Sequence, residues 1–121
     1  MWRFVFIAFL IAHGGIHLAI WATPPSSNAP FDVARSWLWG EQRTLAVTLA
    51  VIIGIVIALA GIGLWAGADW WRPVAVAGLT GSLGLMIVFF NPWFLFIQAV
   101  NAALVFSLIW LDWPSSALVG G

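Results

Sequence analysis

The sequence contains no cysteine, no lysine and no tyrosine, and only 7% of its 121 residues are charged. Without cysteine, the chain cannot form a disulfide, a thiolate metal site or a thiol nucleophile. A soluble domain carries about 25% charged residues, because its surface must face water. The net charge is zero, so no basic face is expected to bind nucleic acid. The low charge therefore predicts an apolar surface that faces lipid.

Four long apolar runs fill most of the chain, at residues 2–22, 44–66, 72–91 and 93–113. A helix needs about 20 apolar residues to cross the hydrocarbon core of a bilayer. Every Arg, Asp and Glu lies outside these runs or at their ends, where a charge is least costly. The sequence predicts an all-α membrane protein: a four-helix, up-down, antiparallel transmembrane bundle that forms one domain over residues 1–121.

All ten tryptophans lie at predicted helix ends or in connections, and the indole ring favours the headgroup boundary of a bilayer. The first run continues to Ala22 without a clean signal-peptide cleavage site, so we expect it to remain as a span. The four arginines divide evenly between the two sides. The amino terminus beside Arg3 and the long polar first loop favour a cytoplasmic N-terminus in a bacterial inner membrane.

The connection over residues 23–43 is the only long one between the predicted spans. Pro24 and Pro25 are expected to end the first helix, because proline lacks a backbone N–H. Within the connection, residues 31–39 place Phe31, Ala34 and Leu38 on one side of a helix. This pattern predicts a short interfacial helix, and a plain surface loop fits it equally well.

Small residues recur every four positions in the later spans, a spacing that lets helix backbones approach closely in lipid. The stripes are Ala46, Ala50, Gly54 and Ala58; Ala77 with Gly81; Gly78 with Ser82; and Ala99, Ala103 and Ser107. We expect them to pack helices inside one chain. The alternative use is a contact between two copies in a homodimer.

The only two histidines, His13 and His17, lie four residues apart within the first span. Residues at this spacing project from the same side of a helix. Gly14 and Gly15 expose the backbone beside them and let a partner helix or a ligand come close. An unpaired polar group is costly in hydrocarbon, so both rings should face the interior and be neutral.

Depth in the membrane predicts which polar residues meet the histidines. The fourth helix should run antiparallel to the first, and counting residues from each midpoint puts His13 level with Asn101 and His17 level with Gln98. Ser82, near the middle of the third span, can join them. These five residues form the predicted ligand or proton site.

A site of this kind predicts a small membrane protein that binds or passes a small polar or protonatable species, and no catalytic residue is expected. Three alternatives remain. The polar residues can form a network that only fixes helix register, the chain can be an accessory subunit of a larger membrane complex, or it can be a redox subunit that binds haem, a metal or quinone. A metal site at His13 and His17 is disfavoured, because no acidic residue lies within a span to complete the ligand set.

The stretch "AHGGIHL", the "GLW" near the end of the second span and Asn101 in the fourth resemble a group of small bacterial four-helix membrane proteins. Members of that group carry an HG-x-I-H-L motif in the first span, matched here by His13, Gly14, Ile16, His17 and Leu18. Where members often have an acidic junction before the last helix, this chain has Asn91-Pro92-Trp93. The layout is also similar to that of DoxX-like proteins. The resemblance implies the four-helix fold and no established activity.

Overall fold

The computed structural model describes residues 1–21 and 32–120, and it is mostly helical. Its elements are α1 (Trp2–Trp21), β1 (Arg35–Ser36), β2 (Gly40–Glu41), α2 (Arg43–Ala66), α3 (Trp71–Val88), the 3₁₀ turn η1 (Pro92–Phe94), α4 (Leu95–Trp110) and α5 (Ser116–Val119). The strands belong to one short antiparallel hairpin.

Three of these helices, α1, α2 and α3, are long and apolar enough to cross a membrane. This length and apolarity indicate an integral membrane protein. Helix α4 is apolar but has only 16 residues, fewer than the predicted run at 93–113. It is shorter because the 3₁₀ turn η1 occupies the start of that run, and because the helix ends at Trp110.

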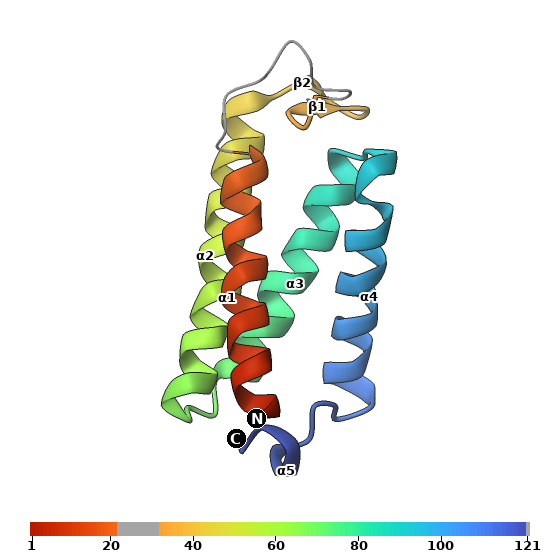
Figure 1. Cartoon of the computed structure of the whole chain (residues 1–121). Coiled ribbons are helices and arrows are strands. Elements are labelled where there is room, and N and C mark those ends of the chain that lie inside the picture. The colour runs from red at the N-terminus through yellow and green to blue at the C-terminus, as the bar shows by residue number, and fades with distance from the viewer. Residues whose placement is uncertain (22–31, 121) are drawn as a thin grey trace.

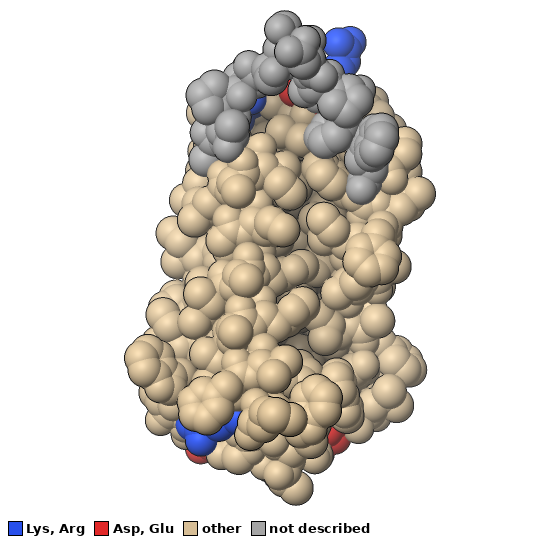
Figure 2. All heavy atoms as spheres, viewed as in Figure 1, with Lys and Arg blue, Asp and Glu red and all other residues tan. Residues whose placement is uncertain are grey.

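The four long helices lie side by side and alternate in direction (Figure 1). Helix α1 packs along α2, α2 along α3, and α3 along α4. In the view of Figure 2, the few charged side chains lie at the two ends of the molecule, and the surface between them is uncharged. This charge distribution is the one expected of helices whose middle portions contact lipid.

Arginine side chains form hydrogen bonds and an ion pair at the end of the bundle where the N-terminus lies. The Arg3 guanidinium donates to the carbonyl oxygens of Leu64 and Trp65, each at 2.9 Å. The last carbonyls of a helix lack regular helical partners, so Arg3 supplies a donor to the Trp65 carbonyl and a second donor to that of Leu64, which also accepts from the Gly67 N–H. At the same end of the bundle, Arg72 donates to the carbonyl of Pro114 and forms an ion pair with Asp112, with 3.5 Å between the charged atoms.

The predicted interfacial helix at residues 31–39 is wrong: in the described part of this segment the chain forms the β1–β2 hairpin. Ser36 donates to the carbonyl of Val88, and the Trp37 indole donates to the carbonyl of Ile87, both at 2.7 Å. The hairpin therefore satisfies carbonyls at the end of α3, which a helix lying in the interface would leave unpaired.

Helices α1 and α2 approach so closely that two glycines face each other. A Cβ atom built on Gly14 would lie 2.4 Å from the carbonyl oxygen of Gly54, and one built on Gly54 would lie 2.6 Å from that of Gly14. Along the same stripe of α2, Ala46 and Ala50 are fully buried and Ala58 is half-buried. This stripe packs within the chain, as the sequence predicts.

The small residues of the other helices divide between the interior and the surface. Gly78 and Gly81 of α3 lie against Ile57 and Ile53 of α2, so they too pack internally. By contrast, Ala77 of α3 and Ala99 and Ala103 of α4 are exposed, and the prediction that these three positions pack inside the chain is wrong. Helix α4 packs mainly along one long helix, α3, and Asn101 is its only fully buried residue.

Tryptophan placement follows the predicted helix ends, but two of these side chains are not at the surface. Trp21 and Trp71 are buried within the apolar cores of the molecule. Their burial means that position at a helix end does not by itself identify an indole that faces the headgroups. Among the tryptophans whose side chains the structure describes, the exposed ones are Trp2, Trp37, Trp39, Trp65, Trp70, Trp110 and Trp113.

Candidate polar site between two apolar cores

The interior contains two apolar clusters with a polar layer between them. One cluster includes Ile7, Ile57 and Leu79, and the other includes Trp21, Ala50 and Met86. Along each helix, the buried polar residues fall between the members of these two clusters. They are His13 and His17 of α1, Ser82 of α3 and Asn101 of α4.

Four hydrogen bonds connect the polar residues in a closed ring. His13 Nε2 lies 2.6 Å from Asn101 Oδ1, and Asn101 Nδ2 lies 2.8 Å from Ser82 Oγ. Ser82 Oγ in turn lies 2.7 Å from His17 Nε2, and His17 Nδ1 lies 2.9 Å from the carbonyl oxygen of His13. The ring therefore joins α1, α3 and α4 at one depth.

One arrangement of protons satisfies all four hydrogen bonds with both imidazoles neutral. A carbonyl oxygen can only accept, so His17 Nδ1 carries its hydrogen and His17 Nε2 accepts from the Ser82 hydroxyl. Ser82 accepts from the Asn101 amide, whose oxygen accepts from His13 Nε2–H. The two histidines therefore adopt opposite tautomers, with hydrogen on Nε2 in His13 and on Nδ1 in His17.

The structure brings together four of the five predicted site residues and leaves Gln98 outside. The expected pairing of His13 with Asn101 is present, whereas His17 pairs with Ser82 instead of Gln98. Gln98 is half-buried and lines a separate open pocket with Trp37, Ile87 and Phe90. Counting residues along a helix predicts the level at which a residue lies in the membrane, but not the direction in which its side chain points.

A column of aromatic rings on α1 encloses the histidine pair, and the sequence analysis missed it. The Phe9 ring stacks on His13 with 5.3 Å between centroids, and Trp21 stacks on His17 at 5.7 Å. The two imidazoles meet edge to face at 5.4 Å. These four residues are spaced by four along the helix, a repeat that predicts one face and could have revealed the column.

The two glycines between the histidines have different surroundings. Gly14 is buried against Gly54 and Ala58 of α2, so it admits a neighbouring helix and not a ligand. Gly15 is exposed, and a Cβ atom there would meet nothing within 4 Å. Close packing at Gly14 holds α1 against α2, which fixes the rotation of α1 and directs both imidazoles toward α3 and α4.

His13 is the more accessible histidine, with 9% of its surface exposed against 0% for His17. Among the described residues, only Asn101 forms a hydrogen bond with the His13 ring, and it uses Nε2. With hydrogen on Nε2, the other ring nitrogen, Nδ1, is an acceptor. It is the one ring nitrogen of the pair that the closed ring leaves unused.

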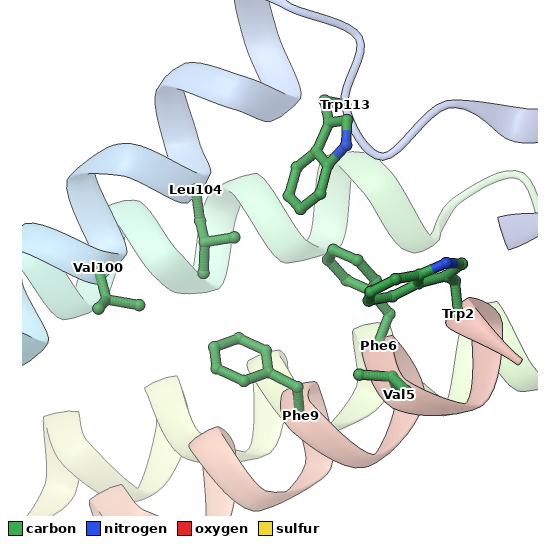
Figure 3. Close-up of a pocket in the computed structure, with 7 residues that line it drawn as sticks. All are labelled: Trp2, Val5, Phe6, Phe9, Val100, Leu104 and Trp113. Atoms are coloured by element: carbon green, nitrogen blue, oxygen red, sulfur yellow. The ribbon is translucent and has the colours of Figure 1, made fainter. Parts of the chain in front are cut away.

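An apolar cleft of about 280 Å³ lies between α1 and the C-terminal part of the chain. Phe9 and Phe6 line it from α1, Val100 and Leu104 line it from α4, and Trp113 closes one end with an edge-to-face contact to Phe6 (Figure 3). Phe9 lines the cleft and also stacks on His13, whereas none of the four polar residues of the site lines the cleft.

Within residues 1–21 and 32–120, no three His, Cys, Asp or Glu side chains gather as a metal site would require. His13 and His17 both direct Nε2 at a protein oxygen, so a metal at those atoms would displace Asn101 or Ser82. The donor set does not fit a closed metal centre.

No family model, curated protein or solved structure gives a significant match to this chain. The resemblance to the group with the HG-x-I-H-L motif therefore stays a prediction.

Proposed function

We propose that this chain is a small four-span protein of the bacterial inner membrane, with a cytoplasmic N-terminus, whose intramembrane site at His13 binds a small polar group. The observation that carries the proposal is His13 Nδ1, an acceptor that the ring of hydrogen bonds leaves unused, on a histidine with only 9% of its surface exposed inside the bundle. A polar atom without a partner is costly in such surroundings, so a donor that reaches it gains a strong hydrogen bond.

Binding is favoured over proton transfer by the identity of the residues in the ring. A proton relay needs groups that both accept and release a proton, and the Asn101 amide stands between His13 and Ser82 in the chain of hydrogen bonds. An amide has no proton that it exchanges at neutral pH, so it interrupts such a relay. The histidine and the amide instead form a fixed recognition surface for a neutral, hydrogen-bonding ligand.

The proposal predicts that 4-fluorophenol, a small apolar ring with one hydroxyl donor, binds at His13 in protein reconstituted into lipid nanodiscs. In ¹⁵N-histidine spectra, the His13 Nδ1 resonance should move with a saturable dependence on the phenol, while the His17 resonances stay nearly fixed. The matched probe 4-fluoroanisole lacks the O–H and should leave Nδ1 unmoved.

A variant measures how much His13 contributes. His13→Phe keeps a flat ring against Phe9 but removes the acceptor, and loss of one hydrogen bond worth about 1.4 kcal/mol weakens binding about tenfold. The ¹⁹F signal of the phenol reports that affinity directly. Equal shifts of Nδ1 with the phenol and the anisole, or an unchanged affinity in His13→Phe, would rule the proposed site out.

A further inference from the structure

We infer that one zwitterionic phospholipid of the bilayer binds in the open pocket that α3, α4 and the hairpin line, with an ester carbonyl of the lipid accepting a hydrogen bond from the Gln98 amide. The pocket lies at the end of the bundle that carries the β1–β2 hairpin, and Trp37, Ile87 and Phe90 complete its described lining (Figure 1). No residue of the hydrogen-bonded ring at His13 is among these, so the inference is independent of the proposed function.

The Gln98 side chain is polar and half-buried, and the fold gives it no partner. Within residues 1–21 and 32–120, its amide forms no hydrogen bond. An unpaired amide on an apolar helix is costly in a membrane, because hydrocarbon offers neither donor nor acceptor. The amide nitrogen can donate two hydrogen bonds. An acceptor from the surroundings therefore stabilises this residue, and the surroundings are lipid.

The depth of the Gln98 amide matches the ester region of a bilayer. From Pro92 to Trp110 the chain rises about 27 Å at about 1.5 Å per residue, close to the hydrocarbon thickness of about 30 Å, so these two residues lie near its boundaries. Gln98 follows Pro92 by about 9 Å. Helical side chains lean toward the N-terminus of their helix, which brings the amide about one turn, or about 5 Å, back toward the boundary. The amide therefore lies close to the ester carbonyls, where the hydrocarbon core ends.

Trp37 gives the pocket a fixed apolar wall at the same boundary. Its indole donates to the Ile87 carbonyl at 2.7 Å, which holds the ring against the end of α3. Because its N–H is engaged, the indole contributes apolar surface, as the side chains of Ile87 and Phe90 do. Gln98 is then the one free side-chain donor among the described lining residues. A carbonyl group flanked by hydrocarbon fits this lining, whereas an ion does not.

The outer face of α3 continues the pocket toward the middle of the membrane. The pocket volume of about 390 Å³ lies within the range of about 300–1,000 Å³ typical of ligand sites and has room for the ester portion of one lipid. On the same side of α3 as Ile87, at helical spacing, are the exposed residues Gly84, Thr80 and Ala77. A Cβ atom built on Gly84 would meet nothing within 4 Å. These small side chains leave space for an acyl chain that extends from the pocket.

The hairpin presents one charge of each sign at the headgroup level. Arg35 and Glu41 lie opposite each other in the β1–β2 register, and both are exposed. Neither forms an ion pair with a described residue. The hairpin also carries Trp37, which lines the pocket, so both charges lie near the headgroup of a lipid bound there. A zwitterionic headgroup, with one phosphate and one ammonium, complements this pair better than an anionic headgroup does.

Native mass spectrometry of the full-length protein, released from detergent micelles with one added lipid at a time, tests the inference. Dioleoyl phosphatidylethanolamine is expected to form a saturable complex of one lipid per chain. Its diether analogue lacks both ester carbonyls and should bind about tenfold more weakly, the effect of one lost hydrogen bond. Dioleoyl phosphatidylglycerol, which has the same chains and an anionic headgroup, should also bind more weakly.

Two variants change the pocket, and each has a matched control elsewhere. Gln98→Leu removes the donor, so it should weaken binding about tenfold and abolish the difference between the ester and diether lipids. Thr48→Leu makes a polar-to-apolar change at an exposed position of α2 and should have no effect. Trp37→Ala removes the apolar wall and should weaken binding severalfold, whereas Trp65→Ala removes an exposed indole at the other end of the bundle and should not.

Weaker binding to Gln98→Leu, together with loss of the ester preference, supports the inference. Equal affinities of wild type and Gln98→Leu, or of the ester and diether lipids for wild type, would overturn it. Equal affinities for the two headgroups would overturn the choice of a zwitterionic lipid. A dimer of the chain that Gln98→Leu dissociates, without bound lipid, would assign the pocket to a second copy and overturn the inference. Melting curves show whether each variant folds, and Trp37→Ala provides the second measurement if Gln98→Leu does not.

Discussion

Replacing Gly14 with alanine is expected to destabilise the protein severely, while the same substitution at Gly15 is harmless. The added Cβ at position 14 would lie 2.4 Å from the Gly54 carbonyl oxygen and 2.9 Å from the Ala58 backbone nitrogen. Backbone atoms of a packed helix cannot yield as a flexible side chain does, so α1 must move away from α2. Overpacking typically costs about 1–3 kcal/mol, and we expect Gly14→Ala to lie at the upper end of that range because the clash is with backbone atoms.

The neighbouring glycine provides a matched control. At Gly15 an added Cβ meets nothing within 4 Å, so Gly15→Ala should change stability by no more than about 1 kcal/mol, the difference in helix propensity between the residues. Thermal unfolding in mild detergent, followed by circular dichroism, compares the two. Gly54→Leu tests the same contact from α2 and should match Gly14→Ala. Equal melting temperatures for the two alanine variants would contradict the close approach of α1 and α2.

Replacing Asn101 with leucine should destabilise the protein far more than replacing Gln98. Asn101→Leu leaves the buried His13 N–H without a partner, and it removes one of the two hydrogen bonds of Ser82 Oγ, which keeps its bond to His17. Each buried polar group left unpaired costs about 1–3 kcal/mol. Gln98 lies outside the ring and is half-buried, so Gln98→Leu should change stability by less than about 0.5 kcal/mol.

Both amide variants add the same side chain on the same helix, three residues apart, so a general effect of leucine cancels between them. Chemical unfolding of the two proteins in the same detergent gives the difference in the free energy of unfolding. A Gln98→Leu protein as unstable as Asn101→Leu would mean that the ring of hydrogen bonds does not stabilise the bundle.

Hydropathy predicts the long helices well because burial of apolar side chains in lipid dominates every other local preference. The described bounds of α1 and α2 lie within a residue or two of the predicted runs, and α3 ends three residues early, at Val88. The hairpin at Arg35–Glu41 could not be predicted in the same way. It depends on hydrogen bonds from Ser36 and Trp37 to the end of α3, which are far away in the sequence.

The polar site is predictable in depth but not in direction. Counting residues along antiparallel helices places Asn101 opposite His13, and the structure joins them. The same count cannot show that Gln98 points away from the ring, or that α3 supplies the partner of His17. Those facts depend on the rotation of α3 and α4 about their own axes, which counting along the chain does not give; the close packing of Gly14 against Gly54 sets the rotation of α1 alone.

The central claim is that two neutral imidazoles, in opposite tautomers, close a ring of hydrogen bonds inside the bundle. The most direct test is the ¹⁵N chemical shifts of His13 and His17 in ligand-free protein in nanodiscs at neutral pH. We predict one ring protonated on Nε2, assigned to His13, and one protonated on Nδ1, assigned to His17. Identical tautomers in the two rings, or an imidazolium at either position, would contradict the account.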